Sequence, residues 1–228
     1  MKFLVHEEGQ LREVEVAVRE VIIAGMTGRD MNAVQKHLDE LAELGIAPPS
    51  TVPIYYRVSA SLLTQEQRIE VVGPDSSGEV EAVLIGTNEG MLVAVGSDHT
   101  DRKVEADSIA ISKQMCPKSI SVDVWRYADV VDGWDDIQLV SDQIDDGEWK
   151  PYQRGTMGKV RKPEDLIGGF FSGQSELPAG VVMYTGTIET LVEIGGADQF
   201  SMALVDPKNG RTLSHVYDAA ILPTSNNQ

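Results

Sequence analysis

The chain has 228 residues, of which 42% are hydrophobic and 24% charged, a balance typical of a globular protein with a core to bury. Asp and Glu outnumber Lys and Arg by 36 to 19, and the net charge of -17 disfavours binding to nucleic acid or to an anionic membrane. The single cysteine excludes an internal disulfide framework, and neither a signal peptide nor an apolar run long enough to span a bilayer is evident. We therefore expect a cytoplasmic protein.

The first predicted elements are a strand and a helix. Residues 13–24 alternate apolar and polar side chains before becoming wholly apolar, which is typical of a strand that enters a core. Asp30 can cap a helix that runs to about Leu44, because apolar residues recur there at helical spacing and Gly45 supplies a stop.

The rest of the chain is rich in predicted strands, which are separated by Gly, Pro, Asp and Asn. A second helix is predicted over 162–171, where a proline and two acidic residues suit a first helical turn. We expect a mainly β protein, in one domain or a domain with a small subdomain, that ends in a disordered tail over 223–228. The remaining predicted strands are 54–58, 69–72, 80–85, 91–95, 137–140, 180–184, 199–205 and 212–217.

Three carboxylates form the most informative cluster. Glu79 and Glu81 stand two residues apart on a predicted strand, so they share one face about 7 Å apart at the backbone, and Asp98 follows the next strand. Three converging carboxylates need a cation, and an all-oxygen set favours Mg²⁺, Mn²⁺ or Ca²⁺ over Zn²⁺. The alternative is that the two glutamates belong to the solvated face of an edge strand.

Other polar groups also suggest chemistry. Residues 97–103 form a dense polar run after an apolar strand, which is either a functional site or a charged turn. No Gly-x-Ser-x-Gly motif supports a Ser-His-Asp triad there.

His37 and Glu40 stand at i and i+3 on the predicted helix. They are either a general base with its orienting carboxylate or a surface pair. Lys113 lies in a largely uncharged window, where a cation must face a specific group. Cys116 is expected to be inert and packed.

In their order along the chain, these motifs resemble the fumarylacetoacetate hydrolase superfamily, specifically its divergent bacterial branch, the DUF2848 family. The resemblance covers about residues 20–222 and rests on several short motifs in the same order. They are a His-x-x-Glu lid motif, an extended segment, a Glu-x-Glu pair, an Asp-x-Ser/Thr-x-Arg segment, a lysine segment and a Thr-Gly-Thr loop. The matching residues here are His37–Glu40, Tyr56–Val58, Glu79–Glu81, Asp98–Arg102, Lys113–Pro117 and 178–187.

The chain also departs from the family pattern. No Asn-Tyr precedes His37, and Arg57 stands where lysine is usual. Lys103 stands where an aspartate is usual, and Ile188 replaces the proline after Thr-Gly-Thr. Because arginine binds a carboxylate as a planar fork and lysine as a point charge, the family's substrate choice does not carry over to this chain.

The resemblance implies a mixed α/β, mainly β fold with a β-roll or β-sandwich core, in which a small N-terminal α/β subdomain with a lid-like helix over 1–50 precedes a β-rich catalytic domain over 51–222. It also implies a divalent cation, Mg²⁺ or Mn²⁺ with Ca²⁺ possible in crystals, held by Glu79, Glu81 and Asp98. It implies that the protein hydrolyses a carbon–carbon bond in a small 1,3-dicarbonyl or acylpyruvate-type acid through a metal-stabilised enolate. Catalysis and binding of this anionic 2-oxo or diketo acid would fall to two sets of residues. The catalytic set is His37, Glu40 and Lys113, and the substrate-binding set is Arg57, Arg102, Thr185, Gly186 and Thr187.

Several alternatives to hydrolysis remain open. The same metal and enolate suffice for decarboxylation of a 3-oxo acid of the oxaloacetate type, or for keto-enol isomerisation. The chain could instead be a non-catalytic binder of small acids. Small members of the superfamily are commonly homodimers, so the resemblance also implies a homodimer.

Overall fold

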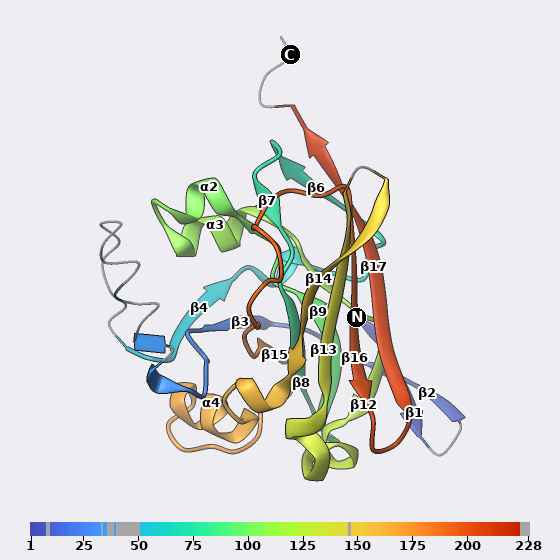
Figure 1. The fold of residues 1–228 in the computed structure, drawn as a ribbon. Helices are drawn as coiled ribbons and strands as arrows, with labels where there is room; N and C mark the ends of the chain where they lie inside the picture. The colour runs from blue at the N-terminus through green and yellow to red at the C-terminus, as the bar shows by residue number, and fades with distance from the viewer. Residues whose placement is uncertain (8–9, 33, 36–38, 40–50, 146, 224–228) are drawn as a thin grey trace.

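The protein is represented by a computed structural model that describes residues 1–7, 10–32, 34–35, 39, 51–145 and 147–223. Two large β-sheets dominate it, and short helices lie at their ends (Figure 1). The prediction of a mixed, mainly β protein is confirmed. Among these residues no helix has the length and apolar character needed to cross a membrane.

The larger sheet has ten strands, in the order β2-β1-β12-β9-β8-β15-β3-β4, with β11 and β5 joined to it beside β9. Its central strands are almost wholly buried because they are continuous apolar runs, as expected for strands covered on both faces. The strands are Lys2–Glu7 (β1), Gln10–Glu15 (β2), Glu20–Gly25 (β3), Ile54–Val58 (β4), Leu63–Thr64 (β5), Val80–Thr87 (β8), Gly90–Ser97 (β9), Lys118–Ile120 (β11), Asp123–Arg126 (β12) and Val181–Tyr184 (β15).

The second sheet has five strands, in the order β14-β13-β16-β17-β6. Residues of β16 alternate between buried and half-buried positions, so one face of this sheet packs on the core. The core between the sheets contains Val80, Val93 and Trp125 from the first and Phe200 and Tyr217 from the second. The strands are Arg68–Val72 (β6), Gln138–Asp145 (β13), Glu148–Thr156 (β14), Gln199–Asp206 (β16) and Arg211–Leu222 (β17).

Short elements complete the fold. The two-stranded ribbon of Ser76–Ser77 (β7) and Thr100–Asp101 (β10) is antiparallel. Helices α2 and α3 lie beside it, and α4 lies at the opposite end of the molecule (Figure 1). The helices are Arg102–Glu105 (α2), Ile109–Met115 (α3) and Pro163–Phe170 (α4), with 3-10 turns at Ala60–Leu62 (η1), Tyr127–Asp129 (η2), Val131–Asp136 (η3) and Met157–Lys159 (η4).

Most predicted elements correspond to observed ones. The helix predicted over 162–171 is α4, with Pro163 in its first turn. The strand predicted over 13–24 is instead the end of β2 and most of β3, because residues 16–19 leave the sheet. The helix predicted from Asp30 to Leu44 lies largely outside the described residues.

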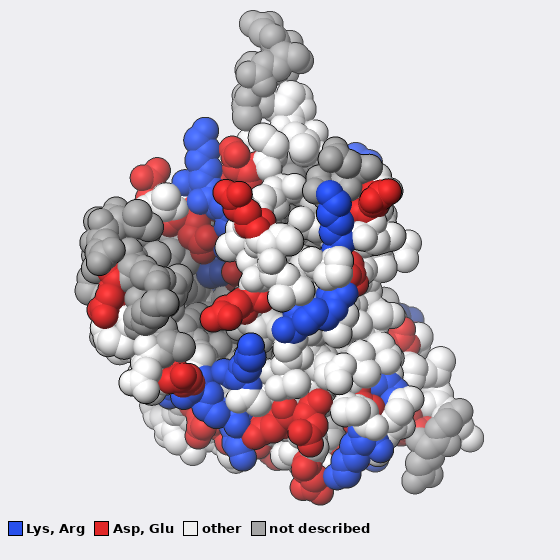
Figure 2. All heavy atoms as spheres, viewed as in Figure 1, with Lys and Arg blue, Asp and Glu red and all other residues white. Residues whose placement is uncertain are grey.

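Two of the described strands in the first fifty residues, β1 and β3, pair with later strands. Strand β1 is parallel to β12, and β3 lies between β15 and β4. In the described part of residues 1–50, the backbone is therefore continuous with the larger sheet. On the face shown in Figure 2, acidic and basic side chains are interspersed rather than gathered into one basic patch.

Candidate metal centre

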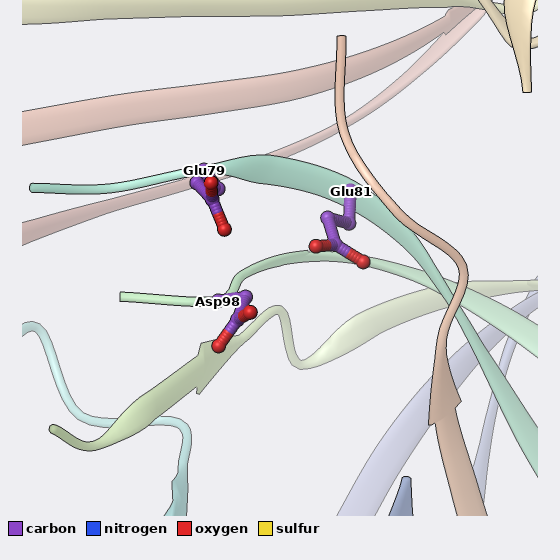
Figure 3. Close-up of side chains that lie close together, drawn as sticks. All are labelled: Glu79, Glu81 and Asp98. Atoms are coloured by element: carbon purple, nitrogen blue, oxygen red, sulfur yellow. The ribbon is translucent and has the colours of Figure 1, made fainter. Parts of the chain in front are cut away.

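The β8–β9 hairpin brings three carboxylates together. Glu79 immediately precedes β8, Glu81 lies within it, and Asp98 follows β9. Because Val80 pairs with Ser97, the Asp98 amide lies 3.1 Å from the Glu79 carbonyl oxygen and donates to it. One ligand oxygen from each carboxylate lies within 4.8 Å of the others, and the three side chains converge (Figure 3).

Glu81 is 2% exposed and lies within β8, a central strand of the larger sheet. Burial and the neighbouring Asp98 and Glu79 charges raise its pKa well above the ordinary value, while the Gly186 amide and Lys113 act in the opposite direction. The Gly186 N–H donates to Glu81 Oε2 over 2.6 Å. Burial of this carboxyl therefore favours its neutral form, and a cation added to the cluster would favour the ionised form.

Asp98 is fully buried between two ammonium groups. Burial acts to raise the pKa of Asp98, but Lys113 and Lys118 outweigh it and hold the pKa below its usual range. Lys118 Nζ lies 2.9 Å from Asp98 Oδ1 and donates to the His99 carbonyl oxygen over 2.6 Å. Lys113 Nζ is in close contact with Asp98 Oδ2.

Glu79 also faces two cations. Arg102 Nη2 lies 3.1 Å from Glu79 Oε1, and Lys113 Nζ lies 3.5 Å from Oε2. Arg102 is held in place because its Nε donates to Ser77 Oγ over 2.7 Å and its Nη1 to Glu105 over 2.8 Å. The three carboxylates are thus matched in formal charge by Arg102, Lys113 and Lys118.

The Thr-Gly-Thr loop fixes the start of β8. The hydroxyl groups of Thr185 and Thr187 donate to the carbonyl oxygens of Ala82 and Val80, each over 2.8 Å. Gly186 between them has φ of +99°. These bonds set the position of Glu81, and they direct both threonine hydroxyl hydrogens to the backbone of β8.

Of the other predicted site residues, Arg57 lies away from the carboxylate cluster, and His37 and Glu40 are not described. Arg57 forms an ion pair with Glu20 at 3.2 Å, and its side chain is 60% exposed. It pairs across β3 and β4 rather than with the carboxylate cluster. His37 and Glu40 lie outside the described residues, so their role as a general base and its orienting carboxylate stays a prediction. Cys116 is buried, and burial raises the pKa of its thiol to about 11.

Lys118 and the contacts of His99 are features that the sequence analysis missed. His99 Nδ1 lies 2.9 Å from Tyr217 Oη, and Nε2 lies 2.9 Å from Ser76 Oγ. Burial, with the nearby Lys118 and Arg102 charges, lowers the pKa of His99 to about 3, so the imidazole is neutral at pH 7. The sequence around Lys118, Pro117-Lys118-Ser119-Ile120, holds no local signal that separates it from a solvated lysine.

The donor set fits a hard divalent cation. All three side chains offer carboxylate oxygens, which suit Mg²⁺, Mn²⁺ or Ca²⁺. Burial, together with the neighbouring Asp98 and Glu79 charges, raises the pKa of Glu81, and a cation bound beside it would favour the ionised form of this carboxyl. Glu79, Glu81 and Asp98 are therefore suitable ligands for such an ion.

Comparison with known proteins gives a family and a fold. Residues 24–217 match the family model described as "Protein of unknown function (DUF2848)". The comparison with curated proteins gave no significant match. Among solved structures, fumarylpyruvate hydrolase from Pseudomonas aeruginosa, in complex with Mn²⁺ and pyruvate, is 17% identical with a TM-score of 0.60, and the alignment covers 97% of this chain and 96% of that one.

Two further structures are similar. A Yersinia pestis CO92 protein named for the fumarylacetoacetate hydrolase family is 18% identical with a TM-score of 0.62, over 92% of this chain and 97% of that one. The 2-keto-3-deoxy-D-arabinonate dehydratase, complexed with magnesium and 2,5-dioxopentanoate, is 12% identical with a TM-score of 0.64, over 96% of this chain and 79% of that one. The family match and the shared fold confirm the resemblance seen in the motifs: the chain belongs to the DUF2848 family and has the fold of the fumarylacetoacetate hydrolase proteins.

Proposed function

We propose that the protein is a divalent-metal-dependent enzyme that hydrolyses a carbon–carbon bond in a small 1,3-dicarbonyl or acylpyruvate-type acid. The observation that carries the proposal is the convergence of Glu79, Glu81 and Asp98 within 4.8 Å at the end of the β8–β9 hairpin. The fold supports it, because similar structures hold Mn²⁺ with pyruvate and magnesium with 2,5-dioxopentanoate.

A divalent cation at this cluster would polarise the oxygens of a 2-oxo acid and stabilise the negative charge that develops as the bond breaks. Glu79, Glu81 and Asp98 would hold it, and the Thr-Gly-Thr loop keeps Glu81 in position through the Gly186 amide. Arg102 and Lys113 place positive charge beside the cluster, which favours an anionic substrate in a protein of net charge -17.

The remaining step needs a base for water. We assign it to His37, oriented by Glu40, on the strength of the His-x-x-Glu motif alone. Arg57, which pairs with Glu20 in this structure, is proposed as a second contact for the substrate carboxylate.

A lyase reaction is the second candidate, such as decarboxylation of a 3-oxo acid. The observation that favours it is the dehydratase of the same fold, which shows that this architecture is not restricted to hydrolases. A decarboxylase would release CO₂ from oxaloacetate, whereas a hydrolase would release pyruvate and a second acid from an acylpyruvate.

Substitution of Glu81 tests the metal-dependent reaction. The purified protein, stripped with a chelator and reloaded with Mn²⁺ or Mg²⁺, is assayed on acylpyruvates and oxaloacetate. We expect Glu81→Gln to lose metal content and turnover together, because the neutral amide removes one of three anionic ligands. Glu66→Gln, at an exposed position, is the matched control and retains both. Thermal stabilisation by an acid without any turnover would instead identify a non-catalytic binder.

A further inference from the structure

Lys113 occupies an unusual position in the candidate metal centre. It lies on α3, whose first turn is capped by the Ser108 hydroxyl, and its side chain is only 8% exposed. Its ammonium group contacts Asp98 Oδ2 closely and lies 3.5 Å from Glu79 Oε2. One side-chain cation therefore bridges two of the three candidate metal ligands.

The other two cations of the cluster have additional anchors. Lys118 donates to the His99 carbonyl oxygen as well as facing Asp98. Arg102 donates to Ser77 and Glu105 as well as facing Glu79. In the part of the chain that the structure describes, the hydrogen bonds and ion pairs of the Lys113 ammonium go to the ligand carboxylates alone.

An ammonium ion and a divalent cation compete in such a place. Both are attracted by the same carboxylate oxygens, and they repel each other when only a few ångströms apart in a buried site. The three carboxylates are already matched in formal charge by Arg102, Lys113 and Lys118. A divalent ion added to the complete set leaves the buried cluster with excess positive charge, and Lys113 is the cation with the fewest other contacts.

We propose that Lys113 is an internal competitor of the metal ion, whose ammonium group holds Glu79 and Asp98 in the metal-free protein and gives way when a divalent cation binds. The metal affinity of the site is then set by the difference between the free energies with which the metal ion and the Lys113 ammonium group bind these carboxylates. This inference rests on the proposed metal centre and is independent of the reaction performed there.

Titration with Mn²⁺, with free ion measured by electron paramagnetic resonance, tests the competition. We expect Lys113→Met to bind Mn²⁺ about 10-fold or more tightly than the wild type, within the usual range of coupling between two sites. Lys113→Arg keeps the charge and is expected to bind as weakly as the wild type. Lys103→Met is the matched control, because it removes the same charge from an exposed position on the neighbouring helix and should leave the affinity unchanged.

Unchanged or weaker Mn²⁺ binding by Lys113→Met would overturn the inference. A second measurement needs no variant: acetylation of lysines in the wild type, read by mass spectrometry, should increase at Lys113 relative to Lys103 when Mn²⁺ is added, and a constant ratio would also overturn it. Failure of every form to bind Mn²⁺ removes the metal centre and this inference together. Tighter binding by Lys113→Met supports the inference even if the Mn²⁺-loaded wild type turns over no acylpyruvate or oxo acid, a result that would contradict only the proposed enzyme.

Discussion

At the scale of single residues, Lys118 is the most deeply buried cation of the candidate metal centre. It is 0% exposed, and its ammonium group forms an ion pair with Asp98 and donates a hydrogen bond to the His99 carbonyl oxygen. Lys118→Met leaves that carbonyl without its donor and Asp98 with a single lysine. We expect the free energy of unfolding to fall by about 3–5 kcal/mol, the usual cost of removing one partner from a buried ion pair.

Urea unfolding of the metal-free protein measures this loss. Lys103→Met should change the free energy of unfolding by less than about 0.5 kcal/mol, since its side chain is exposed. Equal midpoints for the two variants would show that the Lys118 contacts contribute nothing to stability.

The residue scale also shows which site contacts can be predicted from sequence. Glu79 and Glu81 were expected on one face because strand residues repeat with a period of two, and their ligand atoms do meet near Asp98. Lys118 was missed because nothing local distinguishes a buried lysine from a solvated one. Its partner Asp98 lies twenty residues earlier, at the end of another strand. Arg57 forms its ion pair with Glu20 because β4 pairs with β3, and the local sequence pattern does not specify that pairing.

At the scale of elements, the Thr-Gly-Thr loop depends on the glycine at its centre. Gly186 has φ of +99°, and a Cβ there would lie 1.8 Å from Thr27 Oγ1, on a buried β-branched side chain. Gly186→Ala therefore adds a clash to the backbone strain of about 1–3 kcal/mol, and displaces the amide that donates to Glu81. We expect a lower free energy of unfolding and weaker Mn²⁺ binding.

The β8–β9 turn supplies a matched control for this loop. Gly90 has φ of +104°, but a Cβ there would meet nothing within 4 Å. Gly90→Ala should lower the free energy of unfolding by the backbone strain alone and leave the Mn²⁺ affinity unchanged. If both variants lost affinity equally in the same titration, the Gly186 amide would have no special role at Glu81.

Local pattern predicted the continuously apolar strands and the alternating strands β6 and β16, and it missed elements whose pattern is interrupted or too short. The buried runs of β8, β9 and β15 were predicted because strands covered on both faces are continuously hydrophobic. Strand β14 was missed because Pro151 and charged residues interrupt its alternation. Helices α2 and α3 were missed because four and seven residues are too short to show a helical period.

At the scale of the whole molecule, the two sheets meet through residues that are distant in sequence. The Tyr217 hydroxyl on β17 forms hydrogen bonds with His99 Nδ1 and Ser97 Oγ beside the candidate metal centre. Both partners lie more than one hundred residues earlier in the chain. A contact of this kind follows from the stacking of the sheets and cannot be derived from local pattern. The resemblance to a known family did supply the sheet architecture, whereas the homodimer stays a prediction.

One part of the pH dependence of stability comes from a histidine in the second sheet. Burial lowers the pKa of His215 on β17, against a smaller opposing effect of the Glu66 backbone, and its Nε2 is buried without a hydrogen-bond partner in the described structure. The unfolded chain takes up a proton at this side chain near pH 6.5, and the folded chain resists it. Stability from this group is therefore fully present above about pH 6.5 and is lost as the pH falls.

Comparison of the wild type with His215→Gln isolates this effect from the many carboxylates of the chain. Urea unfolding at pH 7.5 and pH 5.5 should show a larger loss of stability in the wild type, by less than about 1.4 kcal/mol per pH unit because the group is partly exposed. Glutamine cannot take up the proton, so its unfolded state gains nothing at low pH. If the two proteins lost the same stability between the two pH values, protonation of His215 would be as favourable in the folded sheet as in the unfolded chain.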